Sequence, residues 1–187
     1  MSRKVSKRLF TVEEYHRMAE VGILTDGDRV ELIEGELIQM PPIGSWHASV
    51  VDRINAILTS RLGKKAIVRV QGPLVLGKRS EPHPDITVLR PKPDFYASQH
   101  PGPRDVLFLI EVADSTVMSD RRLKLPSYAS KGIEEVWIVD RKTDAIEVYR
   151  TPALRGFQDR SVHSRGDRLA PLAFPSTEFR VMELLGK

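Results

Sequence analysis

Apolar residues in the middle of the chain are spaced first as in a helix and then as in strands. Within residues 47–62 they share one helical face, made of Val50, Val51, Ile54, Ile57, Leu58 and Leu62. Gly63 is the expected end of that helix. Three extended segments follow, over 66–76, 86–89 and 105–113. The last segment, DVLFLIEVA, is apolar at nearly every position, which is typical of a central strand covered on both faces.

A second helix is predicted between Ser119, its N-cap, and Lys131, with Gly132 after its end. Further strands are expected over 134–140 and 145–150, and weaker candidates over 157–163 and 178–182. The order helix, strand, strand, strand, helix, strand predicts an α/β fold of the α+β kind. Its core would be a mixed sheet packed by helices.

The N-terminal part carries a helix signal and a hairpin signal. Thr11 and Glu14 form a capping box that opens a short helix, which Gly22 ends. The segment RVELIEGELIQM has two β-rich halves around Glu34-Gly35 and predicts a hairpin. We expect residues 1–10 to be a basic arm and residues 11–187 to be a single domain, because no linker or repeat interrupts the chain.

Composition places the chain among ordinary globular proteins. Its 187 residues are 41% hydrophobic and 29% charged, which excludes the collagen-like, disordered and membrane-spanning classes. The absence of cysteine excludes disulfides, thiolate metal sites and cysteine nucleophiles. No apolar run approaches the ~20 residues of a membrane span, and the basic start lacks the apolar stretch of a secretory signal. A cytoplasmic location without a membrane partner is therefore expected.

The distribution of charge says more than the net charge of +4. The N-terminal arm contributes four basic residues and no acid, so the overall excess is weak evidence for nucleic-acid binding. Residues 53–80, however, contain seven basic residues and no acid, whereas residues 26–36 contain five acids. These neighbouring segments could form a phosphate-binding surface around a cation-binding centre, or they could be solvated surface.

Two acids and one lysine are candidates for chemistry. Asp85 follows a proline at the start of a short strand, and Glu111 lies within the apolar strand. A buried carboxylate is costly unless it is paired, protonated or metal-bound, and two carboxylates on neighbouring strands suit Mg²⁺. Lys124 could place positive charge near a transition state. Alternatively, Asp85 starts a strand, Glu111 pairs with a base such as Arg121, and Lys124 is solvated.

Other common chemistries lack their motifs. The chain contains no phosphate-binding loop, dinucleotide fingerprint, HExxH zinc motif or GxSxG nucleophile elbow. The aromatic residues Tyr128, Trp137 and Tyr149 are better interpreted as core or sheet residues than as base-stacking platforms.

Several motifs in a fixed order resemble those of the Uma family, over roughly residues 10–150. They are VELIEGELIQMPP, SWH, PHPD, LFLIEVADST, a helix with Lys124 and Tyr128, and KGIEEVWIVDRKTDAIEVYR. The family is a group of inferred restriction endonucleases within the PD-(D/E)XK nuclease superfamily. The resemblance implies a restriction-endonuclease-like core and cleavage of DNA phosphodiesters with Mg²⁺ or Mn²⁺ as cofactor.

The resemblance also assigns roles to individual residues. Asp85 matches the aspartate of the Pro-Asp element, and Glu111 matches the acidic residue of the (D/E)XK element. Lys124 fits the displaced lysine of superfamily branches in which the lysine has moved to the next helix, four residues before Tyr128. Asp85 and Glu111 would hold the metal, and Lys124 would offset the negative charge that develops during attack by water.

Two further residues are carried over as candidates, and three depart from the pattern. His47 matches a metal-binding histidine of RecB-type nucleases, or is simply a helix N-terminal residue; Glu31 matches a hairpin glutamate that could reach the metal through water. Ala113 replaces the usual lysine of the (D/E)XK element, and Asp114 adds a charge that could be another ligand or a disturbance. Pro126 implies that the helix of the lysine either begins late, leaving the lysine on a loop, or bends.

The expected partner is DNA, whose backbone would be bound by Arg61, Lys64, Lys65, Lys78 and Arg79. A homodimer is expected as well, because restriction enzymes often cut two strands with two subunits. The competing interpretation is a non-catalytic descendant that binds DNA or another protein. A nuclease that acts on RNA or on single strands is a third and weaker alternative.

Overall fold

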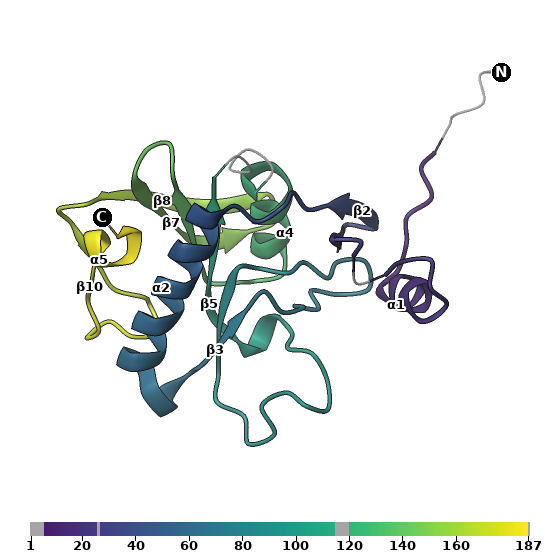
Figure 1. The fold of residues 1–187 in the computed structure, drawn as a ribbon, viewed down its shortest axis with the longest axis horizontal. Coiled ribbons are helices and arrows are strands. Elements are labelled where there is room, and N and C mark those ends of the chain that lie inside the picture. The colour runs from purple at the N-terminus through teal and green to yellow at the C-terminus, as the bar shows by residue number, and fades with distance from the viewer. Residues whose placement is uncertain (1–5, 26, 115–119, 187) are drawn as a thin grey trace.

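The computed structural model describes residues 6–25, 27–114 and 120–186 (Figure 1). The helices are α1 Val12–Glu20, α2 Ser45–Leu62, α4 Leu125–Ser130 and α5 Val181–Leu185. Shorter helical turns are the 3₁₀ turns η1 Gly63–Lys65 and η2 Pro103–Asp105 and the π-helical turn η3 Asp120–Lys124. The strands are β1 Val30–Ile33, β2 Glu36–Gln39, β3 Ile67–Val70, β4 Ile86–Leu89, β5 Val106–Ala113, β6 Glu135–Asp140, β7 Ala145–Ala153, β8 Gly156–Ser164, β9 Arg168–Leu169 and β10 Phe179–Arg180.

Six strands form the main sheet, in the spatial order β3-β4-β5-β6-β7-β8. Strands β5 and β6 are parallel, and every other neighbouring pair is antiparallel. A parallel pair needs a crossover connection, and η3 and α4 lie within that crossover. The sequence α2, β3, β4, β5, α4, β6 reproduces the predicted order, so the predicted mixed sheet is confirmed.

Each face of the sheet carries its own apolar core. On one face, α2 buries Val50, Val51, Ile54, Leu58 and Leu62, the side chains that the sequence pattern assigned to its apolar face. The C-terminal helix α5 packs into the same core. On the other face, α4 contributes Leu125 and Tyr128 to the second core. Figure 1 shows α2 and α4 on opposite sides of the sheet. Strand β5 is covered on both sides, as its apolar sequence predicted.

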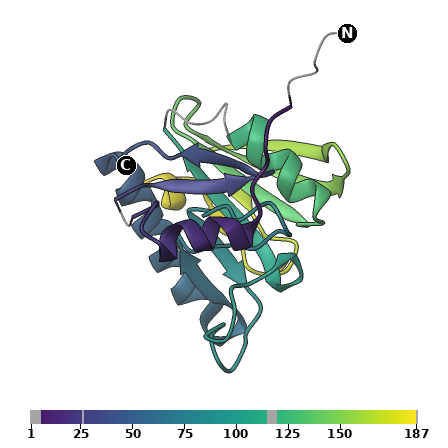
Figure 2. The same cartoon turned by 90° about the vertical axis from the view of Figure 1, so that its right-hand side faces the viewer.

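The predicted hairpin is strands β1 and β2, which meet at Glu34 and Gly35, both with positive φ. It lies beside α1, outside the main sheet (Figure 2). The capping box of Thr11 and Glu14 is present at the start of α1. The hydroxyl of Tyr15 in α1 donates to the carbonyl of Val30, which attaches the helix to the hairpin. The division into an arm over 1–10 and a domain over 11–187 stays a prediction.

Two local predictions are corrected. Of the two alternatives predicted for Lys124, a position on a loop is wrong, because Asp120–Lys124 form a π-helical turn that continues into α4 at Leu125; a bend at Pro126 stays a prediction. Proline cannot donate to a carbonyl four residues earlier, so a wider turn ahead of it accommodates the ring. The predicted N-cap Ser119 lies outside the described residues. The strand predicted over 178–182 is only two residues long, because Val181–Leu185 form α5 and bury apolar side chains.

No helix among the described residues has both the length and the apolar character needed to cross a membrane.

Candidate functional site

Asp85 lies at the entry to β4, and three contacts fix its carboxylate. Oδ2 accepts a hydrogen bond from the backbone N–H of Val112 at 2.8 Å and lies 3.0 Å from Nε2 of His47. Oδ1 accepts from the side-chain amide of Gln71 at 3.2 Å. These contacts come from β5, from the first turn of α2 and from the end of β3. The aspartate of the Pro-Asp motif is therefore held where three elements meet.

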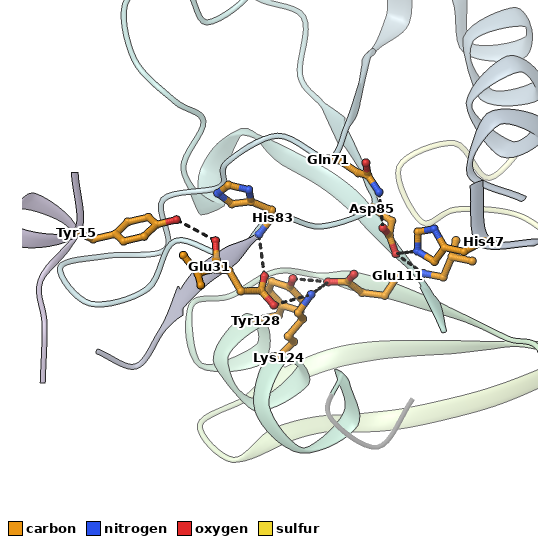
Figure 3. A network of polar contacts seen from close by, with 11 residues as sticks. Tyr15, Glu31, His47, Gln71, His83, Asp85, Glu111, Lys124 and Tyr128 are labelled. Carbon is orange, nitrogen blue, oxygen red and sulfur yellow. Dashed lines mark hydrogen bonds and ion pairs between the residues drawn. The ribbon is translucent and has the colours of Figure 1, made fainter. Parts of the chain in front are cut away.

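Glu111 lies across from Asp85 on the neighbouring strand. Strands β4 and β5 pair Ile86 with Ile110, and continuing this antiparallel register by one residue places Asp85 opposite Glu111. Opposed residues of an antiparallel pair project from the same face with Cβ atoms ~4.5–5.5 Å apart. The structure thus brings the two acids together (Figure 3).

Lys124 reaches the same site from the π-helical turn, and its ammonium lies between two carboxylates. Nζ is 3.1 Å from Oε1 of Glu31 and 3.4 Å from Oε1 of Glu111. The two glutamate side chains are only 3% exposed and the lysine side chain 11%. A buried carboxylate is tolerated when a cation and hydrogen bonds compensate its lost hydration. Lys124 therefore joins the hairpin, through Glu31, to the central strand, through Glu111.

Hydrogen bonds orient both glutamates. The hydroxyl of Tyr128 donates to Oε1 of Glu111 at 2.6 Å. Tyr128 follows Lys124 by four residues, so the two side chains lie on one helical face. Oε2 of Glu31 accepts from the backbone N–H of His83 at 3.0 Å. Tyr128 was interpreted from sequence as a core residue, and its ring is indeed fully buried, but its hydroxyl belongs to the site.

His47 touches the acidic centre through Asp85. The hydrogen bond to that carboxylate raises the pKa of His47, and this effect outweighs the lowering by burial and by the charge of Arg29. The other ring nitrogen, Nδ1, is buried and has no hydrogen-bond partner among the residues that the structure describes. His47 therefore lies in the first turn of α2 and contacts the aspartate directly; whether it binds metal stays a prediction.

One cavity of about 390 Å³ connects these groups. All five predicted site residues line it: Glu31, His47, Asp85, Glu111 and Lys124. Its other polar lining residues are Arg29, Gln39, Gln71, His83 and Asp114. The apolar part of the wall comes largely from the hairpin and the proline-rich segment behind it. The lining of the pocket thus combines acidic, basic and apolar side chains.

The donor set suits a magnesium-type ion that is held by few protein ligands. Within residues 6–25, 27–114 and 120–186, no group of three or more His, Asp or Glu side chains is arranged to hold a metal ion by itself. Mg²⁺ is usually bound through one or two carboxylates, with water and substrate phosphate completing the octahedron. The opposed carboxylates of Asp85 and Glu111 fit that mode, and their oxygens are the ligand type that the ion prefers.

Asp114 lies on the rim of the pocket and forms an ion pair. Its Oδ2 accepts from Nη1 of Arg141 at 2.8 Å, and the guanidinium of Arg141 lies over the ring of Trp46 at 5.2 Å. Asp114 is therefore balanced by a base at the rim.

The basic residues predicted to bind the DNA backbone lie away from the pocket. Arg61 bonds Glu183 in α5 and stacks on Phe179, about 20 Å along α2 from His47 at 1.5 Å per residue. Lys64 and Lys65 follow at the same end of that helix. Lys78 and Arg79 lie in the turn beside α1, where their carbonyls accept from Val12 and Gly35. None of the five lines the pocket.

Sequence reasoning did not single out Gln71 or His83. Gln71 has a positive φ of 47° at the end of β3, which aims its amide at Asp85, and no motif marked it. His83 was visible within the PHPD motif. Burial lowers its pKa, and its Nε2 is a buried atom without a partner among the described residues.

Comparison with known proteins agrees with this fold. A family model named Uma2, described as "Putative restriction endonuclease", matches residues 12–182. The chain belongs to the Uma2 family. The match spans the hairpin, the whole main sheet and nearly all of the C-terminal segment, so it includes every residue of the pocket.

A solved structure supports the fold of this Uma2 protein. It is described as the crystal structure of a putative nuclease belonging to DUF820 from Anabaena variabilis. The two folds superpose with a TM-score of 0.71 at 16% sequence identity, covering 94% of this chain and 97% of the other. A comparison with the curated proteins finds no match.

Proposed function

We propose that this Uma2 protein is a DNA endonuclease that depends on a divalent cation. The observation that carries the proposal is the convergence, in one pocket, of Asp85, Glu111 and an ammonium group, which come from two strands and the following helical turn. The family and the similar solved structure are both described as nucleases, and these descriptions support the same conclusion.

Asp85 and Glu111 would hold Mg²⁺ or Mn²⁺, with His47 as a further candidate ligand. When bound, the cation would ionise a water molecule and stabilise negative charge on a phosphodiester oxygen. Asp85 is ready for this role because Val112 and Gln71 orient its two oxygens.

The protein's own side chains would supply the remaining functions. Lys124 would place its charge beside the phosphorus as it becomes pentacoordinate, where negative charge increases in the transition state. Glu31 keeps the ammonium in place from the hairpin, and Tyr128 keeps Glu111 in place from α4. His47 would keep Asp85 in its orientation, in the manner of a hydrogen-bonded carboxylate beside a metal.

A second function is favoured by specific departures. Ala113 replaces the usual lysine, and the described acids form no three-residue metal cluster. These observations fit a non-catalytic module that binds DNA or another protein. Such a module would still bind DNA in EDTA, with the salt dependence of phosphate contacts, and would give no metal heat in calorimetry.

A plasmid-nicking assay tests the proposal directly. Wild type should nick supercoiled DNA with Mg²⁺ or Mn²⁺ and should fail in EDTA. The double variant Asp85→Ala with Glu111→Ala should be inactive, while Asp52→Ala with Glu134→Ala, two exposed acids outside the pocket, should retain wild-type rates. No nicking by wild type, or nicking that survives the first pair of substitutions, would contradict the mechanism. Parallel assays with RNA and single-stranded DNA separate those substrates from duplex DNA.

We further propose a homodimer and a cytoplasmic location. The homodimer is proposed because cutting both strands from one site would need two subunits or two binding events. Sedimentation velocity measures the oligomeric state and so tests it. A single monomeric species at all concentrations would contradict the dimer.

A further inference from the structure

One wall of the pocket comes from the β1–β2 hairpin, mainly from one of its faces. Side chains two residues apart on a strand project to the same side, and Arg29, Glu31 and Ile33 all line the pocket. The facing residues Ile38 and Met40 line it too: Ile38 pairs with Glu31, and the N–H of Met40 donates to the carbonyl of Arg29 at 2.7 Å. The hairpin that delivers Glu31 to Lys124 therefore delivers Arg29 to the same cavity.

The guanidinium of Arg29 has one modest partner. Nη1 donates to the carbonyl of Pro41 at 2.9 Å, and Arg29 makes no ion pair with any residue in the described part of the chain. An arginine has five N–H donors in a planar fork, so most of its hydrogen-bonding capacity remains for a ligand. The neighbouring cation of the pocket, Lys124, is by contrast held between two carboxylates.

A nucleic-acid strand bound at the site would pass near Arg29. Arg29 lies two residues from Glu31, about 7 Å along an extended chain, and Glu31 contacts Lys124. Arg29 lines the same pocket as Asp85, Glu111 and Lys124, so a strand whose phosphodiester lies at those three residues would place a neighbouring phosphate near Arg29. Its side chain is also near His47, since its charge lowers the pKa of that imidazole.

We infer that Arg29 binds a backbone phosphate next to the phosphodiester that is cleaved, and so sets the position of the strand in the pocket. The inference rests on the proposed nuclease function and deepens it. The inference leaves the predicted role of the five other basic residues unchanged. Those residues lie outside the pocket, whereas Arg29 lines it. A planar guanidinium suits a phosphate because it can donate two parallel hydrogen bonds.

Binding of a fluorescent DNA duplex in EDTA tests the inference without catalysis. Arg29→Gln removes the charge but keeps an amide that can donate to the carbonyl of Pro41, and Arg29→Lys keeps the charge without the fork. Arg90→Gln is the matched control, because Arg90 also donates to a carbonyl, that of Arg104 at 3.1 Å, and lies outside the pocket. Thermal unfolding of each variant checks that the fold is retained.

Arg29→Gln should weaken binding about tenfold and reduce the slope of log affinity against log salt by about one. Arg29→Lys should recover part of the loss, and Arg90→Gln should match wild type. Replacing single phosphates by uncharged methylphosphonates should identify one position near the cleaved bond that costs wild type affinity but costs Arg29→Gln nothing. Such a position would identify the contact itself.

The outcomes separate the two proposals. If Arg29→Gln binds like Arg90→Gln, or if it is sensitive to every methylphosphonate that affects wild type, the inference is wrong even when the protein cuts DNA. If Arg29→Gln loses affinity as described while wild type never cuts DNA, the phosphate site holds and the nuclease proposal fails. If wild type binds no DNA at all, both are wrong.

Discussion

Replacing Lys124 by methionine should destabilise the protein strongly, because it removes the cation between two buried carboxylates. The ammonium lies 3.1 Å from Glu31 and 3.4 Å from Glu111, and both carboxylates are 3% exposed. At an effective dielectric constant of ~20, each contact corresponds to roughly 5 kcal/mol of gross Coulomb attraction. Burying the three charges costs several kcal/mol per ion, so most of this attraction offsets desolvation. Lys124→Met leaves both buried carboxylates without this ammonium, and removing one partner of a buried ion pair typically costs about 3–5 kcal/mol.

Urea unfolding and thermal melting of Lys124→Met measure that loss. For a chain of this length, 3–5 kcal/mol corresponds to a decrease in melting temperature of about 6–20 °C. Lys131→Met is the matched control: it removes an exposed lysine from the end of the same helical segment and should change stability by less than about 0.5 kcal/mol.

A second substitution checks the cause. Adding Glu31→Gln to Lys124→Met removes one of the two buried carboxylate charges, while the glutamine oxygen can still accept from the N–H of His83. The double variant should recover about 1–3 kcal/mol relative to the sum of the single effects. Equal stability of Lys124→Met and Lys131→Met, or strict additivity with Glu31→Gln, would refute this explanation of the cluster.

Two further predictions concern stability. Burial lowers the pKa of His83, so stability from this residue is present above its ordinary pKa of 6.5 and is lost as pH falls through that value toward the lowered folded pKa. As the pH is lowered from 7.5 to 5.5, wild type should therefore lose more stability in urea unfolding than His83→Gln. The raised pKa of His47 contributes equally in both proteins, so its effect cancels in the comparison. Equal losses of stability would contradict this prediction. Gly35→Ala should cost about 1–3 kcal/mol, because φ is +85° and the added Cβ would lie 2.7 Å from Cβ of Leu9. Gly166→Ala, with open space around it, should cost less than ~0.5 kcal/mol, and similar melting temperatures for both variants would contradict the strain.

Much of the fold could be predicted because its signals are local. The apolar period of α2, the Glu34-Gly35 turn and the uninterrupted apolar strand β5 each predict one element without reference to the others. The π-helical turn before Pro126 could not be predicted, because it is a compromise between a missing proline donor and the continuation of the helix. The end of β10 was missed because the apolar run over 178–182 suits a strand as well as a buried helix.

The site was predictable where a motif marked it and not where tertiary pairing made it. Asp85 and Glu111 were apparent as an acid after proline and an acid in an apolar strand, and the sheet register then places them opposite each other. Gln71 belongs to the site because its own backbone is left-handed at the end of β3, and no sequence pattern marks that conformation. No motif marks Arg29 within the acidic segment 26–36, because its place in the pocket depends on which face of the hairpin lines that pocket. The basic residues of the acid-free segment 53–80, in contrast, are divided between the C-terminal end of α2 and the turn beside α1.

Calorimetric titration of Mn²⁺ tests the central claim most directly, because it asks whether Asp85 and Glu111 together bind a divalent cation. Wild type should give saturable heat for a site that Mg²⁺ competes for, and Asp85→Asn with Glu111→Gln should abolish that heat while retaining the wild-type circular dichroism spectrum. Saturable heat that persists in the double variant, or its absence from wild type both with and without a DNA duplex, would contradict the account.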